Sequence, residues 1–158
     1  MNGRSVVSLL LAVAAIFLGG PAAHGAEPFP ISNQLGTSLG LPAGVNLEYV
    51  HEFGRRAIYV AGGYWGRPSH GAQVGVGLVR GGKPRAHYAL ELVAGRFHWR
   101  PSGGRSKEWT YAGLEVYLKY RDFFVAPSLT TGDGTWSDDA SRQTVILGSL
   151  RFGLVSAF

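Results

Sequence analysis

The chain has 158 residues, of which 24 are glycine and none is cysteine, and its formal net charge at pH 7 is +5. The glycine content disfavours a helical protein, because glycine in a helix interior costs about 1 kcal/mol relative to alanine. Without cysteine there are no disulfides, no thiol catalysis and no thiolate metal ligands. A basic chain can bind nucleic acid. The first residues of this chain, however, indicate secretion, which argues against that partner.

Residues 1–26 have the pattern of a secretory signal peptide. Arg4 gives a positive start, and residues 6–19 are apolar except for Ser8. Small residues follow at Gly20, Ala22, Ala23, Gly25 and Ala26. The apolar stretch is shorter than the ~20 residues of a membrane-spanning helix, and a small-residue exit is typical of cleavage. The alternative is a retained anchor. Cleavage would leave residues 27–158 as one domain of about 130 residues.

Alternation of apolar and polar residues with period two predicts eight strands in this domain. They cover residues 35–41, 45–53, 57–65, 72–80, 87–99, 109–120, 123–130 and 144–158. Gly36 and Gly40 interrupt the first of these segments and Pro42 ends it. Whether it is a strand therefore stays open at this point.

The predicted connections alternate in length from the second strand onward. Residues 54–56, 81–85 and 121–122 form short turns, whereas residues 66–71, 101–107 and 132–143 form longer loops. Transmembrane β-barrels have short periplasmic turns and longer outer loops. The short first connection, residues 42–44, departs from this pattern because an even strand count would place it outside.

The two faces of the predicted strands differ in a way that favours a narrow barrel with a polar interior. In residues 109–120, one face carries Ala112, Leu114, Val116 and Leu118, and the other carries tyrosine, glycine and only two charges. Eight strands leave interior room only for side chains. The charges predicted to point inward are Glu48, Glu52, Glu91, Glu115, Lys119 and Arg151. Because an enclosed unpaired charge costs several kcal/mol, we expect a structural network that includes tyrosine hydroxyls.

Two further positions carry specific expectations. Arg96 and His98 fall on the outward face, where a charge is tolerated only near the head groups of a bilayer. Pro127 cannot donate a ladder hydrogen bond. We therefore expect a bulge or a missing bond near Pro127, toward the sixth or the eighth strand.

The chain ends in an alternating strand whose last residue is Phe158, with Ile146, Leu150, Phe152 and Leu154 on the same face. This ending resembles the closing strand of bacterial outer-membrane β-barrels, in which a terminal Phe marks the strand for the insertion machinery. The resemblance extends to the signal peptide, the hairpin rhythm and the inward charges. It implies an all-β, up-and-down antiparallel transmembrane β-barrel in the outer membrane. It also implies contact with outer-membrane lipid and lipopolysaccharide, help from the barrel-assembly machinery, and a monomer.

Small barrels of this kind include enzymes that modify lipid A, so catalysis has to be considered. The deacylases use a His-x-Ser pair, and none of the histidines after the signal peptide has serine two residues later. The palmitoyltransferases use His, Asp and Ser near the outer surface. His98, Ser102 and Asp133 are candidates by residue type only, since no spacing fixes them. We expect neither a cofactor nor a metal site.

The sequence therefore favours a non-enzymatic outer-membrane barrel with a filled polar lumen. Its loops would serve structural, adhesive or small-ligand roles. Two alternatives stay open: a lipid A-modifying enzyme, and a secreted soluble β-barrel that binds a lipid inside.

Overall fold

A computed structural model describes residues 31–158 except for residues 67–68, 84, 101–105 and 137–138. The described residues form eight β-strands and no helix. The strands are β1 (Ser32–Gly40), β2 (Gly44–Phe53), β3 (Arg56–Trp65), β4 (Ser69–Lys83), β5 (Ala86–Trp99), β6 (Lys107–Tyr120), β7 (Phe123–Trp136) and β8 (Asp139–Ala157). Within the described part of the chain, no helix is long and apolar enough to cross a membrane.

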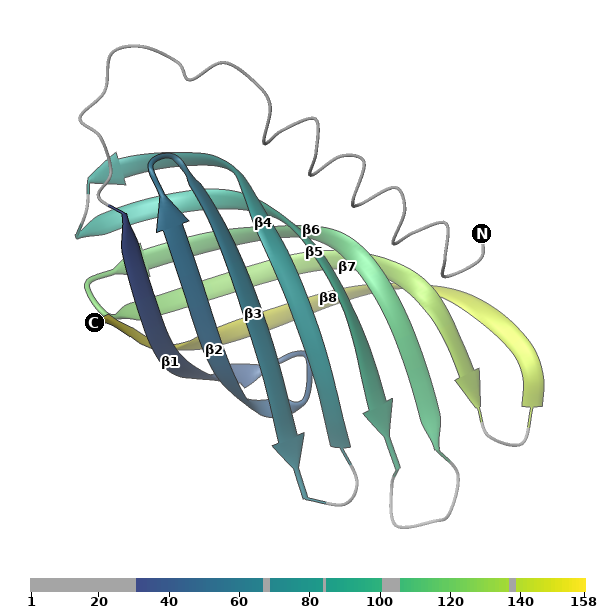
Figure 1. Ribbon diagram of the computed structural model, residues 1–158. Helices are drawn as coiled ribbons and strands as arrows, with labels where there is room; N and C mark the ends of the chain where they lie inside the picture. The colour runs from purple at the N-terminus through teal and green to yellow at the C-terminus, as the bar shows by residue number, and fades with distance from the viewer. Residues whose placement is uncertain (1–30, 67–68, 84, 101–105, 137–138) are drawn as a thin grey trace.

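Each strand pairs antiparallel with the next one, and β1 pairs with β8 to close the barrel (Figure 1). The start of β1, the C-terminus and the turns β2–β3, β4–β5 and β6–β7 lie at one end of the barrel, which we call the short-turn end (Figure 1). The predicted all-β, up-and-down barrel of eight antiparallel strands is confirmed.

The doubtful first strand is a full member of the sheet. All nine residues of β1 pair with β2, and residues 34–39 also pair with β8. The glycines that weaken the local strand pattern have a packing role here. A Cβ at Gly36 would lie only 2.0 Å from the carbonyl oxygen of Leu154 on β8, so only glycine allows this approach.

The prediction of a long loop over residues 132–143 is wrong. β7 continues to Trp136 and β8 starts at Asp139, with these two residues paired across the hairpin. In the same way, β4 starts at Ser69, inside the connection predicted over residues 66–71. The reason is that ladder hydrogen bonds need no apolar side chains. The strands continue after the hydrophobic alternation, on which the prediction rested, has ended.

The expectation for Pro127 is confirmed. Pairing between β6 and β7 runs from Lys107↔Trp136 to Glu115↔Ser128, stops, and resumes at Leu118↔Val125. Pro127 lies in this gap, while its pairing with Leu150 of β8 is continuous. The ladder is thus interrupted on the β6 side only, where proline has no N–H to offer.

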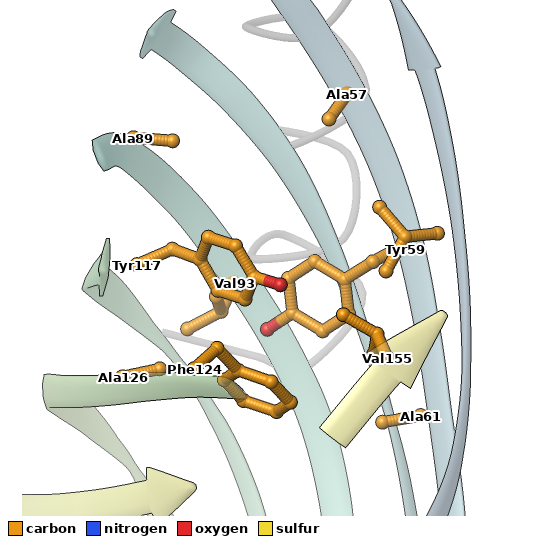
Figure 2. Close-up of a cluster of buried hydrophobic side chains, with 10 residues drawn as sticks. Ala57, Tyr59, Ala61, Ala89, Val93, Tyr117, Phe124, Ala126 and Val155 are labelled. Carbon is orange, nitrogen blue, oxygen red and sulfur yellow. The ribbon is translucent and has the colours of Figure 1, made fainter. Parts of the chain in front are cut away.

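The apolar core lies inside the barrel and is small. Side chains from facing strands meet at its centre, as Figure 2 shows for Tyr59, Val93, Tyr117, Phe124 and Val155. The rings of Tyr117 and Phe124 stack with their centroids 5.0 Å apart. Val50 also belongs to the cluster, and four alanines, whose small side chains leave room for the rings, complete it: Ala57, Ala61, Ala89 and Ala126.

The tight fit of the rings predicts the effect of adding one methyl group. A Cβ at Gly75 would lie 1.9 Å from ring carbon Cε1 of Tyr59, in the packed interior. We expect Gly75→Ala to lower the free energy of unfolding by about 1–3 kcal/mol, the usual cost of overpacking. Urea unfolding followed by tryptophan fluorescence measures it.

The matched control is Gly148→Ala, because a Cβ at this exposed strand glycine meets nothing within 4 Å. Its effect should stay within about 0.5 kcal/mol. Equal effects at both positions would mean that the Tyr59 ring is not packed as described.

Candidate functional site

The six charged residues predicted for the lumen all lie on the inner face of the barrel. Five of them are buried and Lys119 is half-buried. They face inward because side chains alternate along a strand and the neighbouring residues of each strand face outward. The structure divides them between two clusters, one at the centre of the lumen and one at the short-turn end.

The central cluster is built on Arg151 of β8, which is 1% exposed. Its Nη1 donates to Glu48 Oε1 of β2 at 2.5 Å, and its Nη2 donates to Glu115 Oε1 of β6. The guanidinium also lies over the rings of Tyr59 and Phe124, 4.5 and 5.2 Å from their centroids. One cation therefore ties three strands together across the lumen.

A chain of polar side chains continues from this cluster. The hydroxyl of Tyr59 donates to Glu115 at 3.0 Å, and Gln73 donates to the Tyr59 hydroxyl. The hydroxyl of Tyr111 in turn donates to Gln73 Oε1 at 2.6 Å. These hydrogen bonds join Tyr111, Gln73, Tyr59 and Glu115 into one chain, so the centre of the lumen is filled by an ordered polar plug.

The second cluster, at the short-turn end, centres on Glu52 of β2. It accepts hydrogen bonds from Arg80 Nη2 and from the Ser32 hydroxyl, both at 2.7 Å. Nη2 of Arg80 also lies 3.0 Å from Nε2 of His87. Beside these groups, Lys119 donates to Gln34 Oε1, and Gln34 donates to Ser32 at 3.2 Å.

Glu115 and Lys119 lie on the same inward face of β6 but bind different partners. Glu115 pairs with Arg151, and Lys119 lies beside Gln34. Glu91 is 3% exposed, and its Oε2 has no hydrogen-bond partner among the described residues.

Arg80 is the main lumen residue that the sequence did not reveal. Strict alternation from Gln73 would turn Arg80 outward, but the register between β4 and β5 shifts between Gly77 and Val79. The extra residue of this β-bulge re-aims the following side chain into the lumen. His87 could have been found, because its parity in the predicted strand matches that of Glu91.

The catalytic candidates lie on the opposite rim or outside the described residues. His98 faces outward, with Nδ1 3.9 Å from Oε1 of Glu108 and its ring stacked on His70 at 4.7 Å between centroids. Arg96 Nη2 also contacts Glu108, at 2.7 Å. The sequence did not reveal Glu108 as a neighbour of His98, because the predicted sixth strand began one residue later, at Trp109.

Ser102 lies outside the described residues. Asp133, on β7, accepts a hydrogen bond from Thr144 at 3.3 Å. His98 and Glu108 thus place a base beside a carboxylate that could orient it. Among the described residues, no three His, Asp or Glu side chains are placed to hold a metal ion.

No protein-family model, curated protein or solved structure matches this chain.

The bridging position of Arg151 predicts a large effect of removing it. Arg151→Met should lower the free energy of unfolding by at least about 3–5 kcal/mol, because Glu48 and Glu115 would both lose their buried cation. The urea midpoint of the folded barrel measures this loss.

The matched comparison is the triple change Glu48→Gln, Glu115→Gln and Arg151→Met. Because it removes both carboxylates that Arg151 binds together with their cation, it should cost less than Arg151→Met alone plus the two glutamine changes. Additive costs would show that the three side chains do not act as one network.

Proposed function

We propose that the protein is a non-enzymatic outer-membrane β-barrel, plugged at its centre, that acts through its rims. The observation that carries the proposal is the inverted distribution of polarity. Buried charged side chains line the inside, while large apolar side chains are exposed outside, among them Leu47 at 59%, Leu114 at 47%, Leu129 at 62% and Leu154 at 58%. A soluble barrel would have the reverse arrangement, because water is the outer solvent.

The height of the apolar surface supports a bilayer as the outer solvent. On β5 the outward residues from Ala86 to Ala94 are all apolar, and on β6 the same holds from Ala112 to Tyr120. At about 3.4 Å per residue and a tilt of about 40°, each stretch is about 21 Å tall. This is close to the apolar band of about 25 Å on outer-membrane barrels.

Polar groups appear on the outer face where this band ends. Arg96 and His98 follow the band on β5, Thr110 and Glu108 follow it on β6, and Glu108 contacts both Arg96 and His98. Charges at this level lie among lipid head groups, where their cost is small. In this arrangement the short-turn end faces the periplasm and the opposite rim faces the cell exterior.

The two ends of the chain fit the same location. The signal peptide predicted over residues 1–26 lies outside the described residues, and it would bring the chain to the periplasm. Phe158 is 79% exposed, and its backbone N–H donates to the carbonyl of Asn33 at 3.1 Å. The exposed Phe158 ring would contact lipid once the barrel is inserted.

The filled lumen argues against the secreted lipid-binding alternative. An acyl chain needs an apolar cavity. The centre of this barrel instead holds Arg151, Glu48 and Glu115, whose buried charges would lose their partners if a lipid displaced them.

Location is tested by fractionation and gel mobility. Expressed in a Gram-negative host, the protein should be found in the outer-membrane fraction. Because a closed barrel resists SDS without heat, the unboiled band should run faster than the boiled one. A protein found in the soluble periplasmic fraction without a heat-dependent shift would contradict the proposal.

A lipid-modifying enzyme is the second candidate, and the observation in its favour is the outward pair of His98 and Glu108. If the protein is not an enzyme, mass spectrometry should show the same lipid A acyl pattern in cells with and without its expression. His98→Ala, Ser102→Ala and Asp133→Ala should then change nothing. An acyl chain gained or lost on expression, and restored by any of these changes or by Glu108→Gln, would establish the enzyme instead.

A further inference from the structure

A cavity of about 560 Å³ opens at the short-turn end, beneath the lumen plug. Its charged lining comes from three strands and two turns: Arg80, Arg85, Lys119 and Arg121, with the carboxylates of Glu52 and Asp122. Its volume is in the range of small-molecule sites. Its charged lining, however, favours a charged ligand.

The charges of the cavity do not balance. Four cationic side chains face two carboxylates, so the formal excess is two positive charges without counting His87. Glu52 is already paired with Arg80, at 2.7 Å. The remaining three cations, Arg85, Lys119 and Arg121, share the cavity with Asp122 alone. A dianion would neutralise the excess.

The backbone holds this rim in a fixed arrangement. The N–H of Arg121 donates to the carbonyl of Arg85 at 2.7 Å, which joins the β6–β7 turn to the β4–β5 turn. The N–H of Val155 donates to the carbonyl of Asp122 at 2.8 Å and joins the same turn to β8. Gln34 accepts from one N–H of the Lys119 ammonium, which has three. The two turns that carry Arg85 and Arg121 are thus held together before any ligand arrives.

We propose that this cavity binds a phosphate-bearing anion. Lys119, Arg85 and Arg121 would donate to the phosphate oxygens, with the Arg80–Glu52 pair forming part of the floor. Guanidinium and ammonium groups from three different segments suit the several oxygens of a phosphate better than the two oxygens of a carboxylate. The anion has two possible sources: a soluble phosphate ester, or the head group of a phospholipid. The site goes beyond the proposed function and does not depend on it.

The first arm of the test uses pyrophosphate as the soluble probe. Isothermal titration of the folded barrel, in a detergent without charge and at 0.15 M salt, should show saturable binding. Lys119→Gln and Arg85→Gln should each weaken the affinity about tenfold or more, since each removes a charge-assisted hydrogen bond.

The matched control is Lys83→Gln. Lys83 is an exposed cation of the same end and does not line the cavity. Its loss should change the affinity less than about twofold, because exposed charges are screened beyond about 8 Å at this salt concentration. Each variant is first checked for the heat-dependent gel shift. Arg85 lies in a turn, so Arg85→Gln keeps the test valid if Lys119→Gln fails to fold.

The second arm replaces pyrophosphate with dihexanoyl-phosphatidylglycerol. Binding of either probe that depends on Lys119 and Arg85 supports the site, and the probe that binds names the source. The proposal is overturned if neither probe binds, or if Lys83→Gln weakens binding as much as Arg85→Gln does. Because both arms use the barrel in detergent, their failure leaves its cellular location untouched, and the reverse also holds.

Discussion

The salt bridges of Arg151 are the interaction on which the rest of the barrel interior depends. Eight strands enclose a space that only side chains can fill, and in this chain the filling is ionic. One guanidinium meets Glu48 from β2 and Glu115 from β6, so a single side chain of the last strand fixes the positions of two distant strands. Arg151 also lies over Tyr59 and Phe124, which links the ionic network to the small apolar core.

The narrow lumen also limits where large side chains can lie. A narrow lumen can hold a large ring only where the paired residue on the neighbouring strand has no side chain, as in Tyr59↔Gly75 and Gly95↔Tyr111. The Tyr59 ring lies where a Cβ of Gly75 would be, and the Tyr111 hydroxyl lies 2.5 Å from the ideal Cβ position of Gly95. The hydroxyls of these rings join the polar chain through Gln73 to Glu115. The inward glycines and tyrosines are therefore complementary parts of one packing arrangement.

The alternation of side chains was enough to predict the barrel, its strand order and the inward direction of six charges, because parity along a strand is a local property. The ion-pair partners of these charges were not predictable, because they depend on the stagger of strands that are far apart in sequence. Glu115 meets Arg151, 36 residues away, and not Lys119 on its own strand. The inward direction of Arg80 was not predicted for a different reason. A bulge before it adds one residue, and this reverses the parity that the pattern implies.

The plug and the cavity have opposite charge character, and this limits what a ligand could do. At the centre, Arg151 is shared by two carboxylates and Glu91 adds a third nearby in the lumen, so an anion is disfavoured there. At the short-turn end the cationic side chains outnumber the carboxylates. An anion bound in this cavity would meet Tyr117, Phe124 and the acidic plug before it could reach the other rim. The cavity is therefore suited to holding an anion at one face of the barrel and not to passing it through.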